Sequence, residues 1–298
     1  MKKGINVLSL FDGLSCGNVA LERAGIKINN YYASEVDKYA IKISNKNYPG
    51  IIQLGDVLGV KGKDLPKIDL LIGGSPCQDL SFAGKGKGLE GDRSSLFYQY
   101  VRLLKECKPK YFLLENVRMK QEYQDIISDL LGVQPIKINS SLVSAQNRVR
   151  LYWTNIPNVT QPEDKGIVLK DILEDYDTIG EEHFHSDKAI QYMERGNKKW
   201  MQAGNRRADR YTQSPDKEKT FTLTANFHKG VPYNYFDDTR ATSNETTYRK
   251  LTPLECERLQ TIPDGYTSGV SNSQRYRMLG NSWTADTIAH LFKGLKDG

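Results

Sequence analysis

Four side chains combine a thiol, a carboxyl group and two guanidinium groups, a set that could perform covalent chemistry. Cys77 lies in the stretch GGSPCQDLS, Glu115 in LLENV, and Arg148 and Arg150 in AQNRVRLYW. A thiolate is a nucleophile, a carboxyl group can donate or accept a proton, and a guanidinium group holds negative charge. The set indicates nucleophilic catalysis, provided that the fold brings these groups together.

A cysteine at position 77 could also be a small buried residue, half of a disulfide or a metal ligand. The four cysteines are widely spaced and contain no CxxC pair. We therefore expect neither a disulfide framework nor a structural zinc site. Burial is the usual role of a single cysteine. The nucleophile is favoured here because other chemical groups are predicted at the same edge of the fold.

Apolar segments alternate with helical patterns in the first half of the chain, which must position these groups. Strands are predicted at residues 6–11, 31–36, 51–57, 67–74, 110–117, 136–143 and 148–156, and helices at 17–25, 37–48, 95–109 and 124–132. This alternation predicts a doubly wound α/β fold, Rossmann-like, with a mainly parallel sheet covered on both faces. Cys77 and Glu115 then follow strands at the carboxyl edge, where ligands bind. Within a strand, Gln146, Arg148 and Arg150 would share one face.

The stretch FDGLSCG, residues 11–17, connects the first predicted strand to the first helix. Its glycines permit a tight turn, and the helix behind it offers free N–H groups to a cofactor. Glu35 follows the second strand, where an acid can bind a ribose diol, and Asp56 follows the third, where it could bind an adenine amino group. Neither GxGxxG nor GxxxxGK[ST] is present at the turn. The pattern favours a nucleoside-bearing cofactor without a pyrophosphate over a dinucleotide.

Apolar periodicity fades between about residues 155 and 248, which we interpret as an inserted lobe. From Arg195 to Arg210 there are six basic residues and one acid, Asp209, with Trp200 and Tyr211 interleaved or adjacent. Such a segment is typical of a nucleic-acid face, and the alternative is a solvated insertion. The net charge of +6 and the pI near 8.9 are compatible with a polyanionic partner.

The 298 residues allow a main domain with a smaller lobe. We predict a catalytic and cofactor-binding domain at residues 1–154, a recognition domain at 155–248, and segments completing the catalytic domain at 249–298. In this last part, LTPLECERLQTIP predicts a helix with Thr252 as N-cap and Pro253 at its first position. Apolar runs are shorter than the roughly 20 residues of a membrane span, and no signal peptide is found, so a cytoplasmic protein is expected.

Together these motifs resemble the C5-cytosine-specific DNA methyltransferases over nearly the whole chain. FDGLSCG is similar to the cofactor loop of that family, SPCQ to its nucleophile turn, ENV to its substrate carboxylate and QNRVR to its Q-x-R-x-R element. RKLTPLECERLQTIPDGYT and LGNSW resemble its closing motifs, and TFTLTANFHKG resembles a TLTA segment of bacterial recognition domains. SPCQDLS and the tryptophan of GNSW also resemble the animal de novo enzymes and their bacterial or phage relatives.

The resemblance implies a DNA (cytosine-5)-methyltransferase that uses S-adenosylmethionine and no metal. Its substrate would be a cytosine flipped out of duplex DNA at a specific sequence, and Cys77 would bond covalently to C6. Glu115 would hydrogen-bond N3 and the amino group of the base. Arg148 and Arg150 would orient the base, stabilise charge at O2 or hold the phosphate, with the two roles not separated. A monomeric, nucleoid-associated enzyme of a bacterial or phage-infected cell is implied, of the restriction–modification kind.

The implied cofactor residues come from the glycine turn, the ends of two strands and the GNSW motif. They are Phe11, Asp12, Gly13, Leu14, Ser15, Cys16, Glu35, Val36, Asp56, Val57, Asn281, Ser282 and Trp283. Phe11 would stack on the adenine. The implied DNA contacts come from the nucleophile turn, the ENV and QNRVR motifs and the basic lobe. They are Ser75, Pro76, Gln78, Asn116, Val117, Gln146, Arg206, Arg207 and Arg210.

Two other functions stay open. One is an RNA cytosine methyltransferase on the same fold, because one branch of the resembled family acts on transfer RNA. The sizeable middle lobe with its TLTA-like segment weighs against that alternative. The other is a catalytically silent regulator, against which the intact Cys77, Glu115 and Arg150 weigh.

Overall fold

The computed structural model describes residues 4–75, 95–202, 213–240 and 247–296. The chain forms two compact units, each assembled from separate segments. The first unit comprises residues 1–140, 149–163 and 283–298, and the second comprises 141–148 and 164–282. Residues 249–282, which we assigned to the catalytic domain, thus lie in the second unit. The functional division of the chain stays a prediction.

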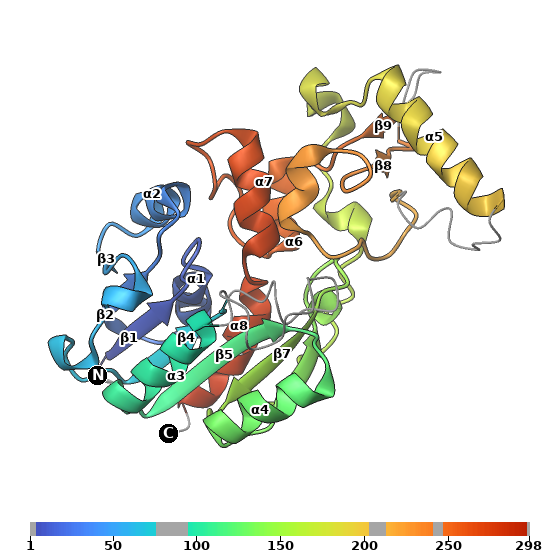
Figure 1. The fold of residues 1–298 in the computed structure, drawn as a ribbon. Coiled ribbons are helices and arrows are strands. Elements are labelled where there is room, and N and C mark those ends of the chain that lie inside the picture. The colour runs from blue at the N-terminus through green and yellow to red at the C-terminus, as the bar shows by residue number, and fades with distance from the viewer. Residues whose placement is uncertain (1–3, 76–94, 203–212, 241–246, 297–298) are drawn as a thin grey trace. The chain divides into compact units, whose positions relative to one another are not determined.

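A seven-stranded sheet forms the centre of the first unit (Figure 1), in the order β3–β2–β1–β4–β5–β7–β6. Its strands are β1 (Ile5–Leu10), β2 (Ile28–Ser34), β3 (Ile52–Gln53), β4 (Leu70–Gly73), β5 (Tyr111–Val117), β6 (Ile136–Asn139) and β7 (Val149–Thr154). Strands β1 to β5 pair in parallel, and β7 is antiparallel to both β5 and β6. The predicted α/β fold with a mainly parallel sheet is confirmed.

Helices cover both faces of this sheet. They are α1 (Cys16–Arg23), α2 (Lys38–Asn47), α3 (Ser95–Cys107), α4 (Gln121–Leu131) and α8 (Ala285–Phe292), with 3-10 turns at Val57–Gly59, Gly62–Asp64 and Lys293–Lys296. Successive strand residues point to opposite faces. Leu8 of β1 therefore joins a core with Phe97 of α3, whereas Val7 joins a second core with Ala20 of α1 and Ile288 of α8. Burial on both faces explains why the strands read as continuous apolar runs.

The second unit contains three α-helices and a two-stranded sheet among its described residues. These elements are α5 (Asp187–Gln202), α6 (Pro253–Leu259), α7 (Asn272–Asn281), β8 (Phe236–Asp237) and β9 (Tyr248–Arg249), with 3-10 turns at Leu169–Ile172, Tyr176–Thr178, Glu181–His183 and Ala225–Lys229; a further turn, Ser140–Leu142, begins at the last residue of a first-unit segment. Helix α6 starts as predicted, with Thr252 as N-cap and Pro253 at its first position. The Thr252 hydroxyl accepts from the Glu255 N–H, and the Glu255 carboxylate accepts from the Thr252 N–H.

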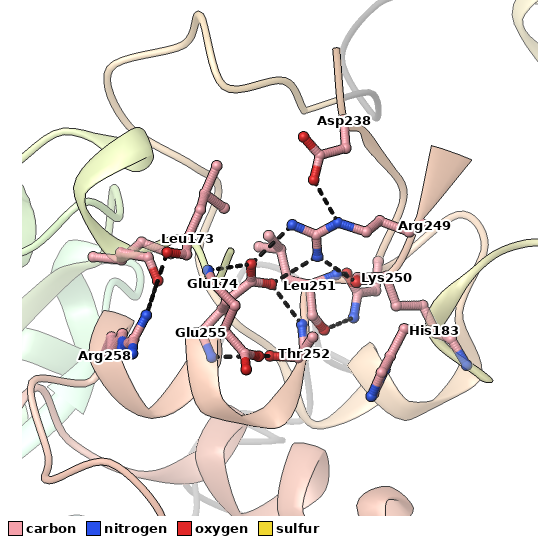
Figure 2. A network of polar contacts seen from close by, with 12 residues as sticks. Leu173, Glu174, His183, Asp238, Arg249, Lys250, Leu251, Thr252, Glu255 and Arg258 are labelled. Carbon is pink, nitrogen blue, oxygen red and sulfur yellow. Dashed lines mark hydrogen bonds and ion pairs between the residues drawn. The ribbon is translucent and has the colours of Figure 1, made fainter. Parts of the chain in front are cut away.

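A buried arginine joins the small sheet to α6 (Figure 2). Arg249 is fully buried, and its Nε donates to Asp238 at 2.7 Å. Its two terminal nitrogens donate to the two carboxylate oxygens of Glu255, both at 2.8 Å. Bidentate, charge-assisted hydrogen bonds of this kind compensate the loss of water around buried charges. The irregular middle of the chain is therefore held by polar contacts as well as by apolar packing.

None of the helices in the described ranges is long and apolar enough to cross a membrane.

Candidate active site

Glu115 and Arg150 form an ion pair at the carboxyl end of β5. In the antiparallel β5–β7 register, Arg150 lies opposite Val117, which makes Glu115 its diagonal neighbour on the same face. The long arginine side chain spans that diagonal, with Nε 2.9 Å from Oε1 of Glu115. Both side chains are largely buried. Their charge-assisted contact holds the Glu115 carboxylate in place through its Oε1 atom.

The second oxygen of this carboxylate has its own donor. Trp283 Nε1 lies 3.0 Å from Oε2 of Glu115. Trp283 and Glu115 both lie close to the backbone of Gly74. A Cβ atom at position 74 would lie 2.9 Å from Trp283 Nε1 and 3.0 Å from Glu115 Oε2. Glycine at position 74 therefore permits this close approach. We predicted Trp283 as a cofactor contact, and its bond to Glu115 was not foreseen, because the motif does not show which group its N–H meets.

The ends of β4 and β5 are joined directly before the predicted nucleophile turn. Asn116 donates through Nδ2 to Ser75 Oγ at 3.2 Å, and its Oδ1 accepts from the Val117 N–H at 2.8 Å. Ser75 and Asn116 are both buried. These contacts fix the position at which the chain leaves β4. Cys77, with Pro76 and Gln78, lies outside the described residues.

The first turn, after β1, is bonded to the end of β2. Phe11 and Gly13 both have positive φ, 57° and 58°, as a sharp reversal between strand and helix requires. The Gly13 N–H donates to Glu35 Oε2 at 2.8 Å, and the other Glu35 oxygen accepts from the N–H groups of Val36 and Asp37 at 2.7 and 2.9 Å. Glu35 therefore shapes the turn that we predicted to hold a cofactor.

Asp12 is an unusual acid within this turn. Burial raises its pKa from 3.8 to about 6, against the opposing effect of hydroxyl hydrogen bonds, and the nearby charge of Glu35 adds to the rise. The Tyr31 hydroxyl donates to Oδ1 of Asp12 at 2.7 Å, and the Ser15 hydroxyl donates to Oδ2. We did not predict a role for Tyr31. Its position on β2, paired with Val7 of β1, is evident only from the strand register.

The predicted cofactor residues of the first unit fit a nucleoside. Asp56 follows β3 and accepts through Oδ1 from the Leu58 N–H at 3.0 Å. Val36 and Leu58, after β2 and β3, are exposed apolar side chains that could cover a flat ring, together with Phe11. Because a carboxylate offers about four acceptor positions, Glu35 and Asp56 keep capacity for hydroxyl or amino groups. The side chains of Leu14, Cys16 and Val57 are buried, so only their backbone could face a ligand.

Gln146 and Arg148 do not lie in a strand, and this part of the prediction is wrong. Strand β7 begins at Val149. Gln146 and Arg148, which precede it, are buried and belong to the second unit. Arg148 is 2% exposed and donates to the carbonyls of Leu223, Gly280 and Ser282 at 3.0, 3.3 and 2.7 Å. These contacts favour a positioning role for Arg148.

Gln146 is bonded in a similar way. Its Nε2 donates to the Leu259 carbonyl at 2.7 Å, and its Oε1 accepts from the Leu223 N–H at 3.2 Å. Ser282 is buried near the end of α7, and its hydroxyl donates to the Leu279 carbonyl at 3.0 Å; Asn281 is the last residue of that helix. Arg206, Arg207 and Arg210 lie outside the described residues.

Comparison with known proteins identifies relatives of the whole chain. A family model described as C-5 cytosine-specific DNA methylase matches residues 5–153 and 134–297. The chain is 30% identical to the Type II methyltransferase M1.ScrFI of Lactococcus lactis subsp. cremoris, over 95% of this chain and 75% of that protein. It is also 30% identical to the Type II methyltransferase M.NlaX of Neisseria lactamica, over 97% and 96% of the two chains.

Two solved structures have a similar fold. The methyltransferase EhMeth of Entamoeba histolytica matches with a TM-score of 0.78 at 18% identity, covering 99% of each chain. The Dnmt2 methyltransferase of S. pombe matches with a TM-score of 0.73 at 18% identity, covering 98% of this chain and 99% of that one.

Proposed function

The chain belongs to the C-5 cytosine-specific DNA methylase family, and from this premise we propose how it methylates cytosine in DNA. We propose that Cys77 bonds to C6 of a cytosine flipped out of duplex DNA at a specific sequence, and that S-adenosylmethionine is the methyl donor. Flipping is required because the reacting atoms of a stacked, paired base are out of reach of a side chain.

The observation that carries the proposal is the coordination of Glu115. Oε1 of Glu115 is already in an ion pair with Arg150, and Oε2 already accepts a hydrogen bond from Trp283. Each carboxylate oxygen has two acceptor positions, so one remains on each. These two positions match the amino group and the protonated N3 of cytosine, which stand side by side on the base. Glu115 would therefore hold the base and favour a proton on N3.

The chemistry follows from that contact. C5 of cytosine is a poor nucleophile until electrons are pushed into the ring. The Cys77 thiolate adds to C6. The electrons of the C5–C6 double bond then shift toward N3, where the proton held by Glu115 stabilises them. S-adenosylmethionine supplies an electrophilic methyl group for C5. A base from solvent then takes the C5 proton, and the electrons of that C–H bond re-form the C5–C6 double bond as the C6–S bond breaks and the Cys77 thiolate leaves.

The residues that would hold the cofactor surround the first turn. Glu35 would bind a ribose hydroxyl through its remaining acceptor position, Asp56 the adenine amino group, and Phe11 the face of the adenine. The Gly13 N–H bond to Glu35 supports this placement, because it holds the carboxylate beside the turn.

The test uses duplex DNA in which cytosine is replaced by 5-fluorocytosine, which cannot lose a C5 proton. We expect a covalent protein–DNA adduct that needs S-adenosylmethionine and is abolished in Cys77→Ser. Cys256→Ser is the matched control, because Cys256 is a buried free thiol of α6. An adduct that persists in Cys77→Ser would overturn the nucleophile, and an adduct with RNA but not with DNA would overturn the substrate.

A further inference from the structure

Four exposed side chains form a stripe along α5. Lys188, Tyr192, Arg195 and Lys199 are all exposed, and Tyr192 is 62% exposed. Their spacing of four, three and four residues places them on one face of a helix, because each residue advances by about 100°. We call these four residues the α5 stripe.

The rest of α5 is arranged to leave the stripe facing solvent. Met193 is buried and Ile190 is half-buried on the opposite side of the helix, and Ala189 is half-buried on the flank between that side and the stripe. The helix has two acids, Asp187 and Glu194. Helical geometry puts both of them about 100° or more around the axis from the stripe. The stripe therefore carries three positive charges and one aromatic hydroxyl with no acid between them.

The dimensions of the stripe fit a nucleic-acid backbone. From Lys188 to Lys199 the helix rises about 16 Å, at about 1.5 Å per residue. That distance equals the axial rise of about five base pairs, each contributing one phosphate per strand. Lysine, arginine and tyrosine are among the side chains that donate to phosphate oxygens.

We propose that the α5 stripe binds the phosphate backbone of the duplex DNA substrate. This inference rests on the proposed function and extends it, because it assigns substrate contacts to described residues outside the family motifs. Phosphate contacts fix where the duplex lies without reading its sequence. The stripe therefore contributes affinity and register, and base discrimination belongs to other residues.

The test removes the three charges together in Lys188→Ala/Arg195→Ala/Lys199→Ala. Alanine keeps the helix propensity high, and circular dichroism checks that α5 is intact. Dissociation constants for a 30-base-pair duplex are measured by fluorescence anisotropy between 50 and 200 mM salt. Log K falls linearly as log salt rises, and each lost phosphate contact makes this line less steep by about 0.9. Over this range the wild type should lose about 40-fold more affinity than the variant.

A matched control removes three exposed charges from the first unit, in Lys63→Ala/Lys67→Ala/Lys105→Ala. Lys67 precedes β4 and Lys105 lies in the last turn of α3, before β5, so both are close to the amino-terminal ends of strands. The control should keep the wild-type slope. An unchanged slope in the α5 variant, or an equal change in the control, overturns the proposal.

The 5-fluorocytosine adduct separates this proposal from the proposed function. If the wild type forms the adduct and the α5 variant keeps the wild-type salt slope, the stripe is wrong and the activity stands. If the wild type forms no adduct with any duplex DNA, the activity itself fails. A slope that falls with RNA but not with duplex DNA assigns the stripe to a different polyanion and also overturns the proposal.

Discussion

The two partners of Glu115 differ in kind. Arg150 brings a positive charge and forms an ion pair with Oε1, whereas Trp283 donates a neutral N–H to Oε2. The guanidinium of Arg148, two residues earlier in the chain, donates hydrogen bonds to backbone carbonyls. Two arginines of one motif therefore have separable contacts: Arg150 pairs with the Glu115 carboxylate, and Arg148 binds the backbone.

This separation predicts different effects of the same conservative change. Arg150→Lys should lower the single-turnover methylation rate by about 100-fold while changing the free energy of unfolding by less than about 1 kcal/mol, because a lysine cannot reproduce the guanidinium contact with Glu115. Arg148→Lys should instead cost about 2 kcal/mol of unfolding free energy, because it leaves buried carbonyls without donors. Denaturant unfolding and rapid-quench assays measure both quantities. Equal rate losses at equal stability would contradict the assignment.

Asp12 predicts a pH dependence of stability. Its pKa is 3.8 ordinarily and about 6 in the folded protein. Between these values the folded protein binds more protons than the unfolded chain, so the contribution of Asp12 to unfolding free energy falls as the pH rises from about 4 to about 6. Asp12→Asn removes this titration. Relative to the variant, the wild type should lose up to about 3 kcal/mol across that window. Parallel stability curves for the two proteins would exclude the effect.

At this scale the sequence indicated where polar side chains lie in the fold better than which groups they contact. Glu115, Arg150 and the FDGLSCG turn could be found from residue types and strand ends. The bonds from Trp283 to Glu115 and from Tyr31 to Asp12 could not, because the first depends on how a residue just before α8 packs against β5 and the second on the register of β1 with β2. Both are decided by packing, which a single motif does not encode.

At the scale of the elements, the last turn of α7 makes one very close backbone contact, at Gly280. A Cβ atom on Gly280 would lie 2.1 Å from the Thr224 carbonyl carbon and 2.3 Å from its oxygen. The last turn of α7 therefore packs directly against the backbone of the TLTA-like segment. Arg148 binds carbonyls on both sides of this contact, at Leu223 and at Gly280.

We predict that Gly280→Ala lowers the free energy of unfolding by about 3 kcal/mol, because backbone atoms must move to admit the methyl group. Gly196→Ala in α5 is the matched control. No atom lies within 4 Å of the Cβ position there, so the change should stabilise the protein by about 0.5–1 kcal/mol through helix propensity alone. Thermal and chemical unfolding of the two variants measures the difference. A Gly280→Ala protein as stable as the wild type would refute the packing argument.

The existence of elements was predictable where apolar periodicity was strong. The seven predicted strands all exist, and α6 begins at its predicted cap, although the strand expected at 31–36 is Ile28–Ser34 and the one expected at 51–57 is only Ile52–Gln53. A further error lies where polar side chains are buried. Gln146 and Arg148 alternate like strand residues, yet their hydrogen bonds to carbonyls keep them outside β7. Periodicity cannot distinguish a polar residue that faces solvent from one that is buried and bonded.

At the scale of the whole molecule, the two units are held together internally in different ways. The first has apolar cores on both faces of its sheet. The second relies in part on the contacts of Arg249 with Asp238 and Glu255 (Figure 2). Composition identified this region as polar and irregular, and could not show that some of its charges are paired inside.

We predict that Arg249→Met destabilises the second unit by about 3–5 kcal/mol, because it removes the ion-pair partner of the buried Glu255 carboxylate, whereas Asp238 keeps Arg240. Arg23→Met is the control. Arg23 pairs with Asp286 at 2.6 Å on a partly exposed surface of the first unit, where an ion pair is worth about 1 kcal/mol or less. Hydrogen exchange should show faster exchange of α6 and β9 amides in Arg249→Met than in the control. Equal exchange in both variants would contradict the prediction.

Both units are discontinuous in sequence, so the second unit cannot be exchanged between related enzymes as a single segment. A chimera that replaces residues 155–248 would cut β9 between Tyr248 and Arg249 and give Arg249 a foreign partner in place of Asp238. A graft of residues 164–282 together with 141–148 would carry both the arginine and its acids. Recombination at the second set of junctions keeps each ion pair within one parent. The second unit would thus be inherited most readily as a two-segment cassette.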